Sequence, residues 1–170
     1  MIHPEHPTHL SRRHFLQSCG AAVGLGTAPS ILGAVPGMAS RIHVGVIGLG
    51  ARGSYLLQAF LNHPEVQVRA VCDVDRHHYR ANPWGQGPAL GREPARKIVE
   101  SFYAQRAARE RYQGCLVFED YRSLCQREDI DAVVVATPDH WHYHQVMAAL
   151  AHGKDVYCEK PVTHTFMEGK

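Results

Sequence analysis

Three glycines near the start of the sequence could bring a phosphate group against the backbone. Residues 48–53 read Gly-Leu-Gly-Ala-Arg-Gly, a G-x-G-x-x-G pattern placed directly after an apolar run. In a strand–turn–helix, Gly48 permits the tight turn, Gly50 lets the backbone approach a pyrophosphate, and Gly53 lets the helix pack closely on the strand. Free amides at the helix start then face the phosphate charge. The motif predicts a dinucleotide site, and Arg52 within it is a further cofactor-binding candidate.

An acidic residue occupies the position that would complete this site. Asp73 follows Gly53 by 20 residues and ends a second apolar run. A carboxylate there can hydrogen-bond both ribose hydroxyls, and it would repel a 2′-phosphate. We therefore predict NAD as the cofactor, with NADP less favoured, although Arg76 and His77 are nearby cations that could accept that phosphate. The alternative is a glycine-rich turn followed by a surface aspartate.

Short apolar runs alternate with helical patterns from Arg41 onward. The strands are expected over residues 42–48, 66–74, 116–118, 132–136 and 156–158. Helices are expected after Gly53 and over residues 94–111, 121–127 and 140–152, the last with Val146, Met147 and Leu150 inward. Residues 82–88 are rich in Asn, Pro and Gly and are interpreted as irregular. This alternation predicts a doubly wound parallel α/β sheet, which is a Rossmann fold.

The first 39 residues indicate an export signal. Arg12-Arg13 precedes Phe15-Leu16, a mildly apolar Gly/Ala-rich stretch follows over 19–35, and residues 37–39 are Gly-Met-Ala. These features predict a twin-arginine-type signal peptide over 1–39 and a mature NAD(P)-binding domain over 40–170. The export machinery would then be a partner, and the location periplasmic or otherwise extracytoplasmic. The alternative is a disordered basic leader.

Composition excludes several classes of protein. The chain is 45% hydrophobic and 20% charged, which is typical of a globular domain. Its formal charge is +2 with scattered Lys and Arg, so we predict no nucleic-acid partner. No strongly apolar run of about 18 residues occurs, so stable membrane insertion is not expected. The five cysteines contain no C-x-x-C pair, and zinc or thioredoxin-like sites gain no support.

Three stretches together resemble the Gfo/Idh/MocA oxidoreductases. They are residues 48–53, the Thr-Pro-Asp-His-Trp-His of 137–142, and the Glu-Lys-Pro of 159–161. The resemblance extends over about 42–165, and the last two motifs are much more specific than the first. It also implies a cis Lys160–Pro161 bond.

The resemblance implies roles for individual residues. Thr137 and Pro138 would border the nicotinamide side of the cofactor, and His142 would lie near the cofactor. Glu159 and Lys160 would close over the nicotinamide ring. As the candidate catalytic residue, Lys160 would help to bind the substrate and assist proton transfer from the hydroxyl being oxidised.

The resemblance also implies what the domain belongs to. Members of the family continue with another strand and an α/β substrate domain, so residues 40–170 would be an incomplete Rossmann domain with an exposed sheet edge beside 156–159. The full-length protein would be a homo-oligomer that oxidises a small molecule, namely a sugar, cyclitol or related compound, whereas this part alone would not turn over. One alternative is a glycoside hydrolase or lyase that uses held NAD in a transient oxidation. Another is a non-catalytic nucleotide-binding module.

A histidine cluster permits a different interpretation. His140 and His144 would share one helical face, a spacing that suits metal ligands, and His142 lies between them. The cluster coincides with the turn that the resemblance places beside the cofactor. We therefore predict no metal site.

Overall fold

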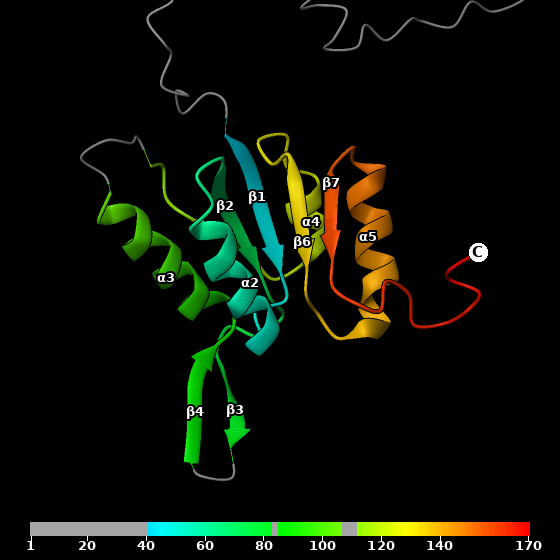
Figure 1. Ribbon diagram of the computed structural model, residues 1–170, viewed down its shortest axis with the longest axis horizontal. Coiled ribbons are helices and arrows are strands. Elements are labelled where there is room, and N and C mark those ends of the chain that lie inside the picture. The colour runs from blue at the N-terminus through cyan, green and yellow to red at the C-terminus, as the bar shows by residue number, and fades with distance from the viewer. Residues whose placement is uncertain (1–40, 83–84, 107–111) are drawn as a thin grey trace, which may run out of the picture. The chain divides into compact units, whose positions relative to one another are not determined.

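The computed structural model describes residues 41–82, 85–106 and 112–170, so the predicted signal peptide lies outside the described residues. Five strands form one sheet in the order β5-β2-β1-β6-β7, and every neighbouring pair is parallel. Their bounds are β1 (Ile42–Ile47), β2 (Val66–Cys72), β5 (Leu116–Phe118), β6 (Ala132–Val135) and β7 (Asp155–Cys158). Together with the helices on its two faces (Figure 1), this sheet confirms the predicted Rossmann-type fold.

The helices cover both faces of the sheet, as a doubly wound fold requires. One face carries α2 (Ala51–Leu61) and α3 (Arg92–Ala104), and the other carries α4 (Tyr121–Cys125) and α5 (His142–Ala151), which follows a 3-10 turn, η2 (Asp139–Trp141). Within the described part of the chain, no helix combines the length and apolar character needed to cross a membrane.

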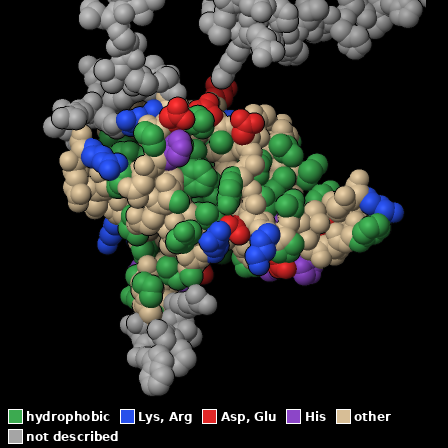
Figure 2. All heavy atoms as spheres, in the orientation of Figure 1, with side chains coloured by type: hydrophobic (Ala, Val, Ile, Leu, Met, Phe, Trp, Pro, Cys, Tyr) green, Lys and Arg blue, Asp and Glu red, His purple; other side chains and the backbone are tan. Residues whose placement is uncertain are grey.

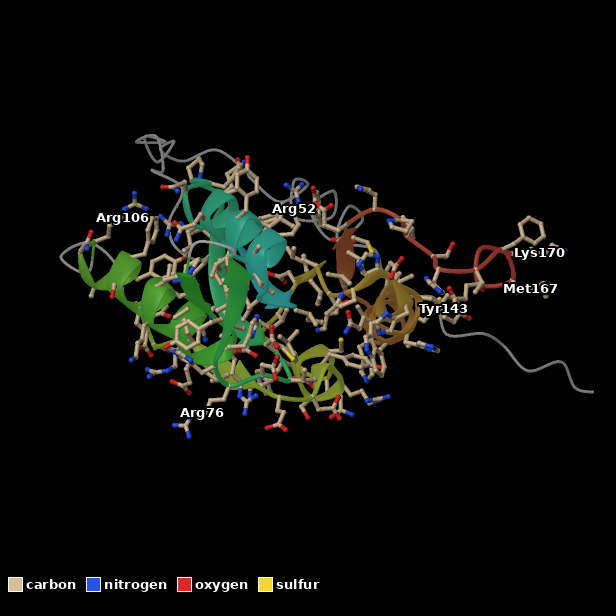
Figure 3. The ribbon with its side chains drawn as sticks, turned by 90° about the horizontal axis from the view of Figure 1, so that it is seen from below. Arg52, Arg76, Arg106, Tyr143, Met167 and Lys170 are labelled. Carbon is tan, nitrogen blue, oxygen red and sulfur yellow. The ribbon has the colours of Figure 1, made fainter. Side chains whose placement is uncertain are left out.

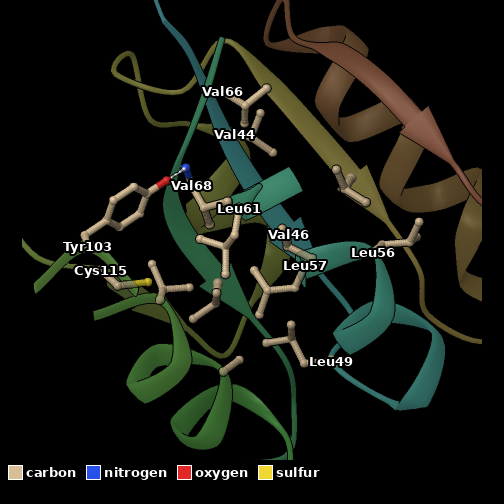
Figure 4. Close-up of a cluster of buried hydrophobic side chains, with 14 residues drawn as sticks. Val44, Val46, Leu49, Leu56, Leu57, Leu61, Val66, Val68, Tyr103 and Cys115 are labelled. Atoms are coloured by element: carbon tan, nitrogen blue, oxygen red, sulfur yellow. Dashed lines mark hydrogen bonds between the residues drawn. The ribbon is translucent and has the colours of Figure 1, made fainter. Parts of the chain in front are cut away.

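The core beneath α2 and α3 explains why the central strands are β-branched. Val44, Val46 and Val68 are at most 2% exposed and pack against Leu57 of α2 (Figure 4). Strand β5 pairs only with residues 70–72 of β2, so it leaves the upstream part of β2 without a partner on that side. There the amide of Val68 donates to the Tyr103 hydroxyl of α3 at 2.9 Å. The side chain thus supplies the hydrogen bond that a longer strand would have made.

The segment after β2 corrects one prediction. We expected residues 82–88 to be irregular, but β3 (His78–Asn82) and β4 (Gly85–Leu90) pair antiparallel as a second, two-stranded sheet. Asn82 pairs with Gly85, and Gly87 and Pro88 lie within β4, whereas residues 83–84 lie outside the described part of the chain. In Figure 1 the hairpin projects beyond the carboxyl ends of the parallel strands.

The buried face of α5 differs from the predicted one. Met147 and Leu150 are 48% and 53% exposed, although we expected both to point inward. Polar side chains on the opposite part of the helix are bound to the protein interior, and these contacts set the rotation of the helix. The buried residues are His142, Gln145 and Ala149, which recur at helical spacing.

Strand β7 is an edge strand of the sheet, as the sequence led us to expect for residues 156–159. Tyr157 on this strand is 46% exposed, and Val162 just after it is 55% exposed. Figure 2 shows hydrophobic side chains reaching the surface on the face that it presents. Within the described residues, this edge of the sheet therefore presents apolar surface.

Candidate cofactor-binding site

A cleft of about 540 Å³ opens at the carboxyl edge of the sheet. From β1 the chain moves outward to β2 and β5, and it then returns to the other side of β1 to form β6. Such a reversal of strand order creates a crevice between the loops that follow the strands, where doubly wound folds bind ligands. Five of the predicted cofactor residues line this cleft: Gly48, Gly50, Asp73, Thr137 and Pro138.

The turn after β1 requires glycine at position 48. Gly48 has a φ of 86°, which is in the left-handed region, and its amide donates to the Cys72 carbonyl at 2.9 Å. A Cβ atom at this position would lie 2.6 Å from the amide nitrogen of Thr137 in the loop after β6. The loops that follow β1 and β6 can therefore meet only because Gly48 has no side chain.

The other two glycines of the motif differ in their surroundings. A Cβ at Gly53 would lie 1.7 Å from the Gly48 carbonyl oxygen, so this glycine sets how closely α2 packs on the turn. A Cβ at Gly50 would meet no atom within 4 Å, so this side of the turn is open to the cleft. No described side chain caps the amino end of α2. Its first amides can therefore serve an anion in the cleft.

Asp73 connects the loop after β2 to the glycine-rich turn. Its Oδ2 accepts a hydrogen bond from the Leu49 amide at 2.6 Å, and its Oδ1 accepts one from the Asp75 amide at 2.9 Å. Each carboxylate oxygen keeps a further lone pair, which leaves room for ligand hydroxyls. The predicted ribose-binding carboxylate is therefore in the cleft and held from two sides.

The end of the cleft around Asp73 is acidic. Asp75, Glu119 and Asp120 line the same region, and Arg122 there forms an ion pair with Asp120 at 3.2 Å. A second phosphate group entering this end would meet several carboxylates and one cation that is already paired. The arrangement therefore disfavours a 2′-phosphate on the ribose.

The two cations that could have accepted such a phosphate lie elsewhere. Arg76 and His77 are exposed and are not among the residues that line the cleft. In Figure 3, which views the carboxyl edge, Arg76 points outward from the ribbon on the side away from Arg52. The His77 ring instead packs edge-on against Tyr79, with ring centroids 4.8 Å apart.

The 3-10 turn after β6 contributes an aromatic side chain that we did not predict as a site residue. Trp141, the last residue of η2, lines the cleft, is 43% exposed and packs edge-on against Tyr121, the first residue of α4. Thr137 donates from Oγ1 to Gln145 Oε1 at 2.8 Å, which fixes the start of the loop after β6 to α5. A tryptophan within the Thr-Pro-Asp-His-Trp-His motif is the sequence signal that could have identified this stacking surface.

His142 lies behind the cleft. It is 1% exposed, and its two ring nitrogens face the carbonyl oxygens of Thr137 at 2.9 Å and Pro161 at 2.5 Å. The ring therefore joins the loop after β6 to the segment after β7. Its predicted nearness to the cofactor stays a prediction, and the contacts that the structure gives it are with the backbone that carries the cleft residues.

The segment after β7 carries the remaining candidates. Glu159 accepts from Nε and Nη2 of Arg52 at 2.8 and 2.6 Å, so this segment is tied to the first turn of α2. That hydrogen bond is the main cause that lowers the pKa of Glu159. Lys160 follows as an exposed residue, and the Lys160–Pro161 bond is cis, as expected. Neither Glu159 nor Lys160 is among the residues that line the cleft.

Burial disfavours thiolate chemistry at Cys72 in the cleft at neutral pH. Cys72 lines the cleft, but burial raises its pKa to about 12. A thiol with that pKa is protonated at pH 7 and is a poor nucleophile or metal ligand. The described cysteines, Cys72, Cys115, Cys125 and Cys158, are all free.

One group among the described residues has the spacing of a metal site. Asp73, Asp75 and His78 place ligand atoms within 4.8 Å of one another. Both oxygens of Asp73 accept backbone hydrogen bonds, and all three residues line the cleft. The alternative cluster of His140, His142 and His144 is not among such groups.

Comparison with known proteins gives the family context. A model of the Gfo/Idh/MocA family, described as an oxidoreductase family with an NAD-binding Rossmann fold, matches residues 42–170. A glycosyl hydrolase family 109 protein of Streptomyces filamentosus is 36% identical over 72% of this chain and 22% of its own length. One from Saccharopolyspora erythraea is 30% identical over 93% of this chain and 35% of its own. The chain thus spans about a third or less of these relatives.

Solved structures give the same fold. Myo-inositol dehydrogenase from Lactobacillus casei, solved with NAD(H) and myo-inositol, matches 75% of this chain and 31% of its own with a TM-score of 0.56 and 29% identity. A 3-ketoreductase from Actinomadura kijaniata, solved with NADP and TDP-benzene, matches 75% and 31% with a TM-score of 0.53 and 28% identity. Both nicotinamide cofactors therefore occur among similar proteins.

The glycine contacts predict effects of very different size for two alanine substitutions. Gly53→Ala should lower the free energy of unfolding by about 3 kcal/mol, because its Cβ would overlap the Gly48 carbonyl. Gly50→Ala should change it by less than about 1 kcal/mol, because that position has φ of −70° and open space. Urea denaturation followed by circular dichroism measures both. Equal midpoints for the two variants would contradict the packing argument.

Proposed function

This chain belongs to the Gfo/Idh/MocA oxidoreductase family as a domain with the NAD-binding Rossmann fold, and from that membership we propose that it holds NAD for hydride transfer involving a hydroxyl of a sugar, cyclitol or related compound. The observation that carries the proposal is the geometry at the glycine-rich turn. Gly50 leaves the turn open to the cleft, while Asp73 is fixed beside it through the Leu49 amide. A pyrophosphate and a ribose diol require that pair of features.

Different residues of the cleft would bind different parts of the cofactor. The uncapped amides at the start of α2 would hold the pyrophosphate, and Asp73 would accept hydrogen bonds from the adenosine ribose. Thr137 and Pro138 would border the nicotinamide half, where Trp141 adds an exposed aromatic face. The acidic residues around Asp73 favour NAD over NADP.

Lys160 is the proposed catalytic residue. The bound nicotinamide would supply the site that accepts or donates the hydride. Removal of a hydride from an alcohol also releases the hydroxyl proton, and Lys160 would take that proton or hold it by a hydrogen bond. The segment that carries Lys160 is fixed on both sides, by Glu159 bound to Arg52 and by the Pro161 carbonyl facing His142. These contacts position the lysine without using its amine.

A second candidate function rests on the named relatives. The two glycosyl hydrolase family 109 proteins share 36% and 30% identity with this chain over 72% and 93% of its length. A hydrolase or lyase of this kind would oxidise the sugar transiently and return the hydride, so NAD would be neither consumed nor reduced overall. Glycoside cleavage without added cofactor would select this function over net oxidation.

We also propose that the chain is part of a longer, exported protein. Its 22% and 35% coverage of the two relatives supports a further domain that binds the substrate and forms contacts in a homo-oligomer. The Arg-Arg sequence and the Gly/Ala-rich stretch within residues 1–39 support export by the twin-arginine route. Sequencing the gene beyond the codon for Lys170 tests the first statement, because a stop codon there would contradict it.

Cofactor choice can be measured on this chain. We expect it to bind NAD⁺ at least about tenfold more tightly than NADP⁺, a difference of about 1.4 kcal/mol. Asp73→Ser should weaken NAD⁺ binding and narrow that ratio, because it removes the ribose acceptor and one carboxylate. Asp155→Ser is the matched control. Asp155 is the first residue of β7 and lies at the amino ends of the strands, away from the cleft, so this variant should change neither affinity. Calorimetric titration gives both constants, and a preference for NADP⁺ would contradict the proposal.

The role of Lys160 requires the full-length protein. Lys160→Met should lower kcat by a factor of about 10² to 10⁴, the range expected for loss of a general acid–base group. NAD⁺ affinity should stay within about twofold, because the amine is assigned to the hydroxyl proton. Stopped-flow measurement of the nicotinamide absorbance follows the hydride step. Near-normal kcat in this variant would remove Lys160 from the catalytic role.

Export is tested separately from catalysis. Residues 1–39 fused to a reporter that is active only outside the cytoplasm should deliver it there. Replacement of both Arg12 and Arg13 by lysine should abolish delivery, because the twin-arginine route reads the paired guanidinium groups. Fractionation and reporter activity measure this, and unchanged delivery by the double variant would reject the route.

A further inference from the structure

Arg92 makes an unusual set of contacts at the back of the cleft. It is the first residue of α3, directly after the β3–β4 hairpin, and its side chain is 16% exposed. Its Nη1 donates to the carbonyl oxygens of Asp73 at 2.9 Å and Val74 at 2.7 Å. Its Nη2 donates to Glu119 Oε2 at 2.9 Å. One planar guanidinium thus joins the loop after β2 to the loop after β5.

These loops form the acidic end of the cleft, whereas Arg92 lies outside it. Asp73, Val74 and Glu119 all line the cleft, and Arg92 does not. The guanidinium therefore holds the lining from behind. Because both Nη1 hydrogen bonds go to backbone carbonyls, they turn the backbone of the loop toward Arg92 and leave the Asp73 carboxylate on the glycine-rich turn.

The backbone at the start of α3 strengthens the same connection. The amide of Gly91 donates to the Leu49 carbonyl, and the amide of Arg92 donates to the Asp75 carbonyl, each at 3.1 Å. Gly91 has φ of 100°, and a Cβ there would lie 2.8 Å from the Asp75 carbonyl oxygen. The start of α3, which follows the hairpin, is thus fixed by backbone hydrogen bonds to the glycine-rich turn and to the loop after β2. These hydrogen bonds determine the position of Arg92.

We infer that Arg92 is a positioning residue for the adenosine-ribose half of the cofactor. The inference rests on the proposed function, because it assumes that Asp73 binds the ribose of NAD. Charge-assisted hydrogen bonds to carbonyls are stronger than neutral ones, so their loss would let the loop after β2 move relative to the glycine-rich turn. Among the described residues, the side-chain hydrogen bonds of Arg92 go to the loops after β2 and β5 and none to the loop after β6, so the nicotinamide half of the cleft would keep its geometry.

The experiment separates the two halves of the cofactor. The full chain and its Arg92→Gln variant are titrated calorimetrically with NAD⁺, with AMP and with nicotinamide mononucleotide. Arg92→Gln should weaken the binding of NAD⁺ and of AMP about tenfold. It should change the affinity for nicotinamide mononucleotide by less than about twofold. Arg96→Gln is the matched control: it lies on the same helix and pairs with Glu93 and Glu100. It should leave all three affinities within about twofold.

A second variant keeps the test decisive if Arg92→Gln does not fold. Arg92→Lys retains the charge, but a single amine cannot reproduce the fork that joins two carbonyls and a carboxylate. Arg92→Lys should weaken AMP binding severalfold and leave the affinity for nicotinamide mononucleotide unchanged. An AMP affinity equal to that of the wild type would overturn the inference.

The remaining outcomes distinguish the inference from the proposed function. In one outcome the wild-type chain binds NAD⁺, but Arg92→Gln weakens the binding of AMP and of nicotinamide mononucleotide equally, or weakens the binding of neither. The positioning role is then overturned and the cofactor proposal stands. If the wild-type chain binds no NAD⁺, the proposed function fails and this inference fails with it.

Discussion

The cofactor cleft depends on one close approach of backbone to backbone. The turn after β1 passes so near the start of α2 and the loop after β6 that neither Gly48 nor Gly53 has room for a Cβ atom. This approach brings the uncapped amides of α2 over the carboxyl end of the central strand. It also places the loop after β6 against the same turn, so the glycine-rich turn contacts the residues that line both ends of the cleft. A larger residue at either position would separate the helix from the sheet and open the site.

The loops around this turn are held from behind by side chains that bind backbone carbonyls. His142 faces the carbonyls of Thr137 and Pro161 at the end of the cleft near β6 and β7. Arg92 binds the carbonyls of Asp73 and Val74 at the other end. In both cases the polar contact lies outside the cleft, so the groups that line it remain available to a ligand. Preorganised loops of this kind reduce the conformational entropy lost when a cofactor binds.

Proteins that resemble this domain carry names of different activities. Proteins named as glycosyl hydrolases and solved dehydrogenases or ketoreductases all resemble this cofactor domain, which spans only about a third or less of each. In a nicotinamide-dependent enzyme the cofactor carries the hydride, and the protein binds and orients it. Both functions proposed above would use the one candidate cofactor site of this domain.

Local sequence patterns were enough to predict the sheet, most helices and the glycine-rich turn, because β-branched runs, helical spacing and glycine all act over a few residues. The same patterns misjudged Asn82 and residues 85–88, since Gly and Pro disfavour a strand although these residues lie in paired strands. They also placed the exposed Met147 and Leu150 on the buried face of α5. What α5 buries depends on partners distant in sequence, such as the Pro161 carbonyl that faces His142. Arg92 was missed for the same reason. A side chain that binds a carbonyl or lines a cleft acquires that role only when the tertiary fold brings its partners to it.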